Sequence, residues 1–246
     1  MKAFAKTDIG KARENNQDYY YIPNQTEKLN LCILADGMGG YNGGEVASKL
    51  ATETVKKYIK TNFPKEECSK EECSKEAILS LIKNAMEYAN MVVYEKSKEV
   101  KELEGMGTTL DICLIYNNKV FIGHVGDGRI YRIRGNIIRK LTKDHSYVQK
   151  LIEDGTITRE EAITHPKKNM LMKALGCTPY VEPDIRARNY EPNDILIMCS
   201  DGLTNMVKEE QIYKMVKENA NNAPENLVNL ANQLGGYDNI TVITIL

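Results

Sequence analysis

The feature that most constrains the fold is a unit that occurs three times, an apolar run that ends in Asp-Gly. The acidic residues of the three copies are Asp36, Asp127 and Asp201. Each apolar run predicts a short buried strand, and the glycine after it lets the chain turn or approach a ligand closely. Because Asp-Gly is also a strong turn signal, a single copy does not distinguish a binding site from an ordinary turn.

A fourth carboxylate, Asp238, stands just before the last apolar run at residues 240–245. If the four strands share one edge of a sheet, the carboxylates converge, and their repulsion makes some of them bind protons unless cations neutralise them. Carboxylates and the backbone carbonyl of Gly37 are hard oxygen ligands, which suit Mg²⁺ or Mn²⁺. The repetition therefore predicts a cluster of divalent metal ions.

Arg13 and Asp18 flank a polar turn between two predicted strands, so both could face one site. A guanidinium can hold a phosphate through two parallel hydrogen bonds, but an arginine in a polar loop can also be a solvated cation. The local sequence leaves both interpretations open.

The remaining pattern predicts antiparallel strands with helices in two pairs, and the layer rules assign such a chain to the α+β class. Asn117-Asn118 and Gly135-Asn136 each predict a two-residue hairpin turn. The predicted strands are residues 3–7, 18–22, 31–36, 110–116, 119–125, 129–134, 137–141, 185–190, 195–200 and 240–245. The predicted helices are residues 44–62, 74–100, 147–154, 158–162, 208–220 and 224–234.

The length of 246 residues and a hydrophobic fraction of 42% fit a single globular domain over residues 1–246. The formal net charge of −1 argues against a surface for nucleic acids or anionic membranes. The N-terminus lacks the apolar core of a signal peptide, and no apolar run approaches the ~18 residues of a membrane span. We expect a cytoplasmic protein without a nucleic-acid or membrane partner, and we expect it to be a monomer.

The cysteines do not predict a disulfide framework or a zinc site, because no Cys-x-x-Cys is present and the histidines are scattered. Cys32, Cys113 and Cys199 lie in apolar runs and are expected to be small core residues. Cys68 and Cys73 belong to a repeated Lys-Glu-Glu-Cys-Ser, for which we expect a solvated, charged insertion at about residues 64–75.

A set of short motifs, in a fixed order along nearly the whole chain, resembles the metal-dependent serine/threonine phosphatases of the protein phosphatase 2C family in their compact bacterial form. The motifs are Arg-Glu-Asn-Asn-Gln-Asp at 13–18, Asp-Gly-Met-Gly-Gly at 36–40, Gly-Thr-Thr at 107–109, Val-Gly-Asp-Gly-Arg at 125–129, Ser-Asp-Gly-Leu at 200–203 and Gly-Tyr-Asp-Asn-Ile-Thr at 236–241. The resemblance implies two antiparallel sheets packed as a sandwich, with a helical layer outside each. It also implies a flap beside the active site at about residues 145–176.

The same resemblance implies hydrolysis of phosphoserine and phosphothreonine on proteins by water that is activated at a centre of two Mn²⁺ or Mg²⁺ ions. Asp36 would bridge the two ions, and the Gly37 carbonyl would complete one of them. Asp201 and Asp238 would bind the other ion. The substrates would be proteins phosphorylated by a cognate Ser/Thr kinase.

Three further roles follow from the resemblance. Asp18 would orient metal-bound waters, and Arg13 would hold the substrate phosphate in line for attack. Asp127, together with Asp201, would bind a weaker third ion near the flap.

The chain departs from the family at the positions where a histidine could donate a proton to the leaving group. Some members carry a histidine directly after Asp-Gly and many bacterial members carry one after the glycine pair, but this chain has Met38 and Tyr41 there. His124, His145 and His165 lie in a predicted strand, a loop and the flap. We therefore predict that no histidine is the general acid and that a metal-bound water protonates the leaving group.

Two other functions stay open at this point. A catalytically silent module that binds phosphoproteins would keep the fold, but it should have lost metal ligands, and none is missing. A metal-dependent hydrolase of small phosphate esters would share the metals and differ only in the flap, so the sequence does not separate it from a protein phosphatase.

Overall fold

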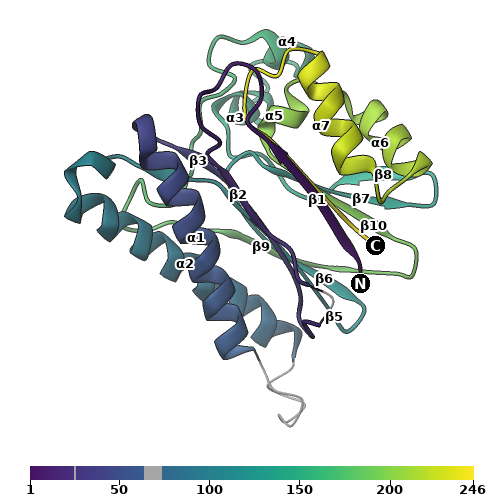
Figure 1. The fold of residues 1–246 in the computed structure, drawn as a ribbon, viewed down its shortest axis with the longest axis horizontal. Coiled ribbons are helices and arrows are strands. Elements are labelled where there is room, and N and C mark those ends of the chain that lie inside the picture. Colours follow the sequence, from purple (N-terminus) through teal and green to yellow (C-terminus); the bar gives the residue numbers. More distant parts are fainter. Residues whose placement is uncertain (25, 64–73) are drawn as a thin grey trace.

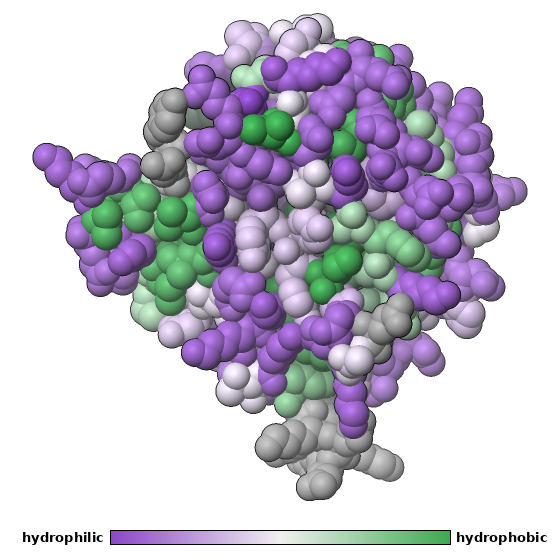
Figure 2. All heavy atoms as spheres, viewed as in Figure 1, coloured by the Kyte–Doolittle hydropathy of each residue, from purple (hydrophilic) through white to green (hydrophobic). Residues whose placement is uncertain are grey.

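Two antiparallel β-sheets form the centre of the fold, and helices cover the outer face of each sheet (Figure 1). The structure is a computed structural model that describes residues 1–24, 26–63 and 74–246, without the side chains of residues 40–42. The sandwich with outer helical layers is the predicted α+β architecture, and that prediction is confirmed. Figure 2 shows hydrophilic side chains over most of one face, with hydrophobic atoms gathered over the layer of the helices α1 (Gly40–Asn62) and α2 (Lys75–Glu99).

The first sheet brings the two ends of the chain together, in its edge strand and the strand beside it. Its strand order is β1-β11-β10-β7-β8. Lys2 donates its backbone N–H to the carbonyl of Leu246, which fixes the termini side by side. The strands are β1 (Ala3–Asp8), β7 (Arg129–Arg134), β8 (Ile137–Lys140), β10 (Ile195–Cys199) and β11 (Ile240–Ile245).

The second sheet has the strand order β2-β3-β5-β6-β9, and the short strand β4 pairs with the end of β3. The β5–β6 hairpin turns at Asn117 and Asn118, which have φ of 47° and 56°, as the two-residue turn requires. The strands are β2 (Asp18–Tyr21), β3 (Asn30–Met38), β4 (Gly107–Thr108), β5 (Leu110–Tyr116), β6 (Lys119–Val125) and β9 (Asp184–Asn189).

The long helices lie in two pairs that are close in sequence, as predicted. The pair α1 (Gly40–Asn62) and α2 (Lys75–Glu99) packs on the second sheet, and the pair α6 (Glu209–Glu218) and α7 (Ala223–Gln233) belongs to the first. Ser74 begins α2 by accepting a hydrogen bond from the backbone N–H of Ala77 at 3.1 Å. The shorter helices are η1 (Lys101–Leu103), α3 (Tyr147–Glu153), α4 (Arg159–Thr164) and α5 (Asp201–Thr204).

Strand β3 shows why the apolar runs in the sequence are continuous rather than alternating. Leu31, Ile33 and Ala35 pack toward α1 and α2, whereas Cys32 and Leu34 pack between the two sheets. A strand that is buried on both faces needs apolar residues at every position. The continuous apolar run before Asp36 is therefore explained by the four-layer fold, in which this sheet is covered on both faces.

The structure corrects four details of the predicted elements. Strand β3 continues to Met38 because β4 pairs with its last two residues, so Asp36 lies within the strand and not at its end. Helix α1 begins at Gly40 rather than at residue 44, because Gly39 takes a φ of 110° and turns the chain directly into the helix. The β7–β8 turn has positive φ at Gly135 but not at Asn136. The four-residue helix α5 was not predicted.

The charged insertion, with Cys68 and Cys73, lies outside the described residues except for its last two positions, which cap and begin α2. Cys32, Cys113 and Cys199 are buried and free, which confirms their prediction as core residues. In the described part of the chain, no helix has both the length and the apolar character to cross a bilayer.

We expect Leu196→Ala to lower the free energy of unfolding by about 2–5 kcal/mol, because Leu196 is fully buried between the sheets and its loss leaves a cavity there. Urea denaturation of purified protein measures this change. Ile137→Ala is the control, since Ile137 is 66% exposed at the sheet edge and its removal should cost less than about 1 kcal/mol. Equal effects of the two substitutions would contradict the assignment of the inter-sheet core.

Candidate metal and phosphate site

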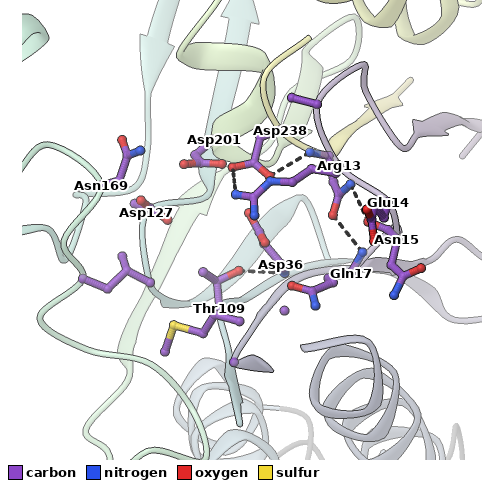
Figure 3. A pocket seen from close by; sticks show the side chains of 16 residues that line it. Arg13, Glu14, Asn15, Gln17, Asp36, Thr109, Asp127, Asn169, Asp201 and Asp238 are labelled. Atoms are coloured by element: carbon purple, nitrogen blue, oxygen red, sulfur yellow. Dashed lines mark hydrogen bonds and ion pairs between the residues drawn. The ribbon is translucent and has the colours of Figure 1, made fainter. Parts of the chain in front are cut away.

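The predicted acidic residues meet in a pocket of about 650 Å³ at one end of the two sheets (Figure 3). Asp36 comes from the second sheet and Asp127 from the turn after β6, whereas Asp201 and Asp238 come from segments next to β10 and β11 of the first sheet. The pocket is thus built where the ends of both sheets meet. Arg13 and Gly37 also line it, so six of the seven predicted site residues face one space.

Asp36 is held in place by threonines of the neighbouring chain segment. Its backbone N–H donates to the Thr109 hydroxyl at 2.9 Å, and its carbonyl accepts from the Thr109 N–H at 2.8 Å and from the Thr108 hydroxyl at 2.9 Å. The carboxylate is consequently fixed relative to the sheet rather than carried on a free loop.

The structure gives a second reason for glycine at position 37. A Cβ there would lie 2.0 Å from the carbonyl oxygen of Gly44, which belongs to the first turns of α1. The sequence suggested that the missing side chain opens the carbonyl to a ligand, but close packing of α1 against β3 already requires glycine.

Asp18 is the seventh predicted residue and lies beneath the pocket, directly opposite Asp36 in the β2–β3 ladder. It is 8% exposed, and one carboxylate oxygen accepts hydrogen bonds from Ser200 at 2.8 Å and Thr241 at 2.6 Å. Asp18 therefore connects the two sheets under the site. Its other oxygen, Oδ1, is buried and has no hydrogen-bond partner among the described residues.

Asp201 and Asp238 are both oriented by asparagines. Asp201 is the first residue of α5 and accepts from the side-chain amide of Asn205 at 3.0 Å, while its buried Oδ1 has no partner in the described chain. Asp238 accepts from the backbone N–H of Asn239 at 2.9 Å.

Arg13 reaches over the carboxylates and donates to Asp238 at 2.7 Å (Figure 3). Its side chain is 52% exposed, and its guanidinium lies beside Asp238 in the pocket. The loop that carries it is attached to the C-terminal segment, because the Asn239 side chain donates to the carbonyls of Ile9 and Asn15 and accepts from the Gln17 N–H. Position and charge both favour the phosphate-binding interpretation over a solvated loop cation.

Sequence reasoning missed several residues that build this site. Ser200, Thr241, Thr109 and Asn239 lie inside the quoted motifs, so their proximity to the acidic residues was the available signal. Asn169 lines the pocket and lies near Asp127 (Figure 3); the expected flap indicated this segment, but no local motif singled out this residue.

Burial and mutual repulsion raise the pKa values of most of these carboxylates, and too little positive charge lies nearby to offset this. Burial raises the pKa of Asp18 to about 7, and burial with the nearby Asp201 raises the pKa of Asp127 to about 8. Burial and Asp238 raise the pKa of Asp201 to about 6. Burial, and next the charge of Asp18, raise the pKa of Asp36 well above its usual range. One arginine on Asp238 does not neutralise this charge.

The donor set fits hard divalent cations. Buried carboxylate oxygens without partners, on Asp18 and Asp201, are what a bound cation or its waters would satisfy. Across residues 1–24, 26–63 and 74–246, however, no group of three or more acidic, histidine or cysteine side chains is arranged so that it could hold a metal ion by itself. Cations that keep several of their waters need few protein ligands, so the open arrangement suits Mg²⁺ and Mn²⁺ better than zinc.

None of the three histidines lines the pocket, whereas Met38 does. His124 is 1% exposed within β6, and the side chain of His145 is 9% exposed. His165 ends α4 and accepts a hydrogen bond from the backbone N–H of Lys167. The side chain of Tyr41 lies outside the described residues.

The profile of the family described as "Protein phosphatase 2C" matches residues 10–235. The chain belongs to the protein phosphatase 2C family. This phosphatase is 34% identical to "Serine/threonine phosphatase stp" of Listeria innocua, and the match covers 100% of this chain and 95% of that protein.

Solved structures agree with the sequence match. The serine/threonine phosphatase PstP/Ppp of Mycobacterium tuberculosis is 34% identical, with a TM-score of 0.86 over 99% of this phosphatase and 97% of that chain. A catalytic domain of serine/threonine protein phosphatase PstP solved in complex with two manganese ions is 32% identical, with a TM-score of 0.84 over 99% of this chain and 96% of that one.

The family, the fold and the general activity predicted from the sequence are thereby confirmed. The protein is a metal-dependent serine/threonine protein phosphatase that acts on phosphoproteins. The similarity extends over the whole length and includes a metal-bound relative, which disfavours a catalytically silent binding module.

In the absence of divalent cations, we expect the free energy of unfolding to decrease between about pH 5 and pH 8. The raised pKa values of Asp18, Asp127 and Asp201 mean that the folded state retains protons that the unfolded chain releases near pH 4. Each of these groups stabilises the fold below its unfolded pKa, and this contribution is lost as pH rises through its folded pKa. Urea denaturation in chelator at several pH values measures the slope.

Asp127→Asn is the matched variant for this experiment, because it removes the group that titrates near pH 8 and should flatten the upper part of the curve. Addition of Mn²⁺ should also flatten the wild-type curve, since cation binding favours the ionised carboxylates. An unfolding free energy that rises over this range in chelator would contradict the uncompensated charge.

Proposed function

We propose that the pocket binds two Mn²⁺ or Mg²⁺ ions that Asp36 bridges, with the Gly37 carbonyl on one ion and Asp201 and Asp238 on the other. The observation that carries the proposal is the convergence of acidic residues whose buried oxygens lack partners and whose pKa values are raised. When bound, such ions supply a hydroxide nucleophile near neutral pH and neutralise charge on the phosphoryl oxygens.

Asp18 and Asp127 have separate proposed roles. Asp18 lies opposite Asp36 in the β2–β3 ladder and has a buried oxygen without a partner among the described residues, so it is proposed to orient water on the ions. Asp127 faces the same pocket from the other side, and with Asp201 it is proposed to hold a weaker third ion.

Arg13 is proposed to hold the phosphate through its planar guanidinium. In this structure Arg13 instead pairs with Asp238, so phosphate would have to compete with that carboxylate for the guanidinium. Half of the Arg13 side chain is exposed at the pocket opening, so the exchange of partners requires no movement of the core.

The leaving group is proposed to receive its proton from water. His124 and His145 are buried outside the pocket, and Met38 has no proton to donate. The cognate kinase as source of substrates, the single-domain and monomeric organisation, the flap role of residues 145–176 and the cytoplasmic location stay predictions.

The defining experiment is release of phosphate from a phosphothreonine peptide with Mn²⁺, repeated after chelation and compared with p-nitrophenyl phosphate. A protein phosphatase should lose activity on both substrates with chelator and prefer the peptide in kcat/KM. Turnover of the small ester with no turnover of phosphopeptides or phosphoproteins would favour the alternative, a hydrolase of small phosphate esters.

We expect Asp36→Asn to lower kcat by about 10² or more, because the substitution removes the carboxylate proposed to bridge the ions that generate the nucleophile. Initial rates at saturating Mn²⁺ measure this loss, and calorimetry should show weaker Mn²⁺ binding. Asn205→Ala is a control that loosens one hydrogen bond of Asp201 but removes no charge. Near-normal turnover of Asp36→Asn would overturn the two-ion assignment.

We expect Arg13→Ala to raise KM more than it lowers kcat, and Arg13→Lys to recover only part of the loss, because lysine lacks the planar fork. The same Arg13→Ala protein should bind Mn²⁺ at least as tightly as wild type, since Asp238 is released from its ion pair. An unchanged KM for a small aryl phosphate would return Arg13 to the role of a solvated loop cation.

A further inference from the structure

One histidine holds both backbone groups of the residue before Asp127. The backbone N–H of Gly126 donates to His145 Nδ1 at 3.1 Å, and the carbonyl of Gly126 accepts from the His145 N–H at 2.7 Å. Gly126 has a φ of 117°, and a Cβ there would lie 2.5 Å from the Thr109 side chain. The turn that carries Asp127 is therefore enclosed between Thr109, which orients Asp36, and His145.

The same histidine is joined to the segment expected to be the flap. Its carbonyl accepts from the Met172 N–H at 2.7 Å, and the next pair is formed by the Tyr147 N–H and the Met170 carbonyl at 2.8 Å. Between these bonds lies Leu171, which lines the pocket with Asn169. His145 thus lies between the Asp127 turn on one side and the pocket-lining part of the flap on the other.

The protonation state of His145 suits the bond to Gly126. Because Nδ1 accepts from an N–H, the ring proton must lie on Nε2, which is 3.4 Å from Asp184. Burial, together with the charge of the adjacent His124, lowers the pKa of His145 to about 4 and keeps the ring neutral. A protonated His145 would have no lone pair for Gly126.

His124 provides the adjacent charge. Its ring lies 4.7 Å from the ring of His145, and its Nδ1 is 2.6 Å from the buried Asp111 carboxylate. The Asp111 carboxylate raises the pKa of His124, although burial acts in the opposite direction. The two neighbouring histidines therefore differ in their interactions. His124 is paired with a buried carboxylate, whereas His145 is neutral and accepts a hydrogen bond.

We propose that His145 is a positioning residue that joins the flap segment to the Gly126–Asp127 turn, so that the order of residues 145–172 and the placement of Asp127 depend on one side-chain acceptor. The proposal goes beyond the assigned activity, and its link to a third ion rests on the proposed function. Ordinary packing of a buried histidine would explain the ring stack, but it would not require an acceptor at Nδ1.

The test uses two variants that each keep one end of the imidazole. His145→Asn places its carbonyl oxygen where Nδ1 lies and so keeps an acceptor for Gly126. His145→Gln places its amide at the Nε2 end, keeps the contact with Asp184 and leaves Gly126 without an acceptor. Gln149→Ala is the control within the flap, because among the described residues that side chain bonds only Glu153, on its own helix.

The first measurement is amide hydrogen exchange by NMR in metal-free protein. We expect His145→Gln to speed exchange roughly three- to tenfold at Gly126 and also at Tyr147 and Met172, the loss typical of one hydrogen bond. The Tyr147 and Met172 amides keep their own backbone acceptors in this variant, so a merely local loss would leave them unchanged. His145→Asn and Gln149→Ala should match wild type.

The second measurement is Mn²⁺ titration followed by electron paramagnetic resonance. We expect His145→Gln to weaken the weakest class of bound Mn²⁺ at least threefold and to leave the tight class unchanged, because Asp36, Asp201 and Asp238 are untouched. His145→Asn should restore the weak class.

Unchanged exchange at Tyr147 and Met172 in His145→Gln would overturn the proposal, and so would equal effects of the Asn and Gln variants. If His145→Gln does not fold, His145→Ala is measured in its place against His145→Asn. A wild type that binds only two ions would overturn the third-ion assignment, while exchange in metal-free protein would still decide the role of His145. Absence of phosphatase activity would affect only the proposed function.

Discussion

Mutual repulsion among buried carboxylates is the constraint on which the rest of the structure depends. Asp36 belongs to one sheet, Asp201 and Asp238 adjoin the other, and Asp127 lies in the turn that connects the two, so no single sheet could assemble the group. Packing the two sheets face to face brings the acids together, and the apolar contacts of strands such as β3 hold them there at the cost of raised pKa values. Divalent cations relieve this cost, which is why stability and function are expected to respond to the same ligand.

Hydroxyl and amide side chains fix the acids without adding charge. Ser200 and Thr241 hold Asp18 between the sheets, Thr109 holds the backbone of Asp36, and Asn239 ties the Arg13 loop to the C-terminal segment. Neutral donors satisfy one side of each group and leave other oxygens unpartnered, as on Asp18. A cation-binding site needs carboxylate oxygens that lack hydrogen-bond partners, because carboxylates with all oxygens hydrogen-bonded would have none left to bind a cation.

The two sides of the pocket differ in how firmly they are attached. Asp36 lies within β3 and is bonded into the sheet, whereas the segment with Asn169 and Leu171 is connected through loops and short helices. His145 supplies bonds to both the Asp127 turn and the Met172 backbone, so it links the segment with Asn169 and Leu171 to the turn that carries Asp127.

The sequence by itself determined most of the strands, the paired helices, the α+β class and the acidic residues of the pocket, because continuous apolar runs, helical periodicity and repeated Asp-Gly are local signals. It did not determine that Asp36 lies within β3, because the pairing of β4 joins residues about 70 positions apart. It also could not show that Arg13 pairs with Asp238 or that His145 holds Gly126. Those contacts join segments distant in the chain, and only the packing of the two sheets and the attached loops decides which side chains meet.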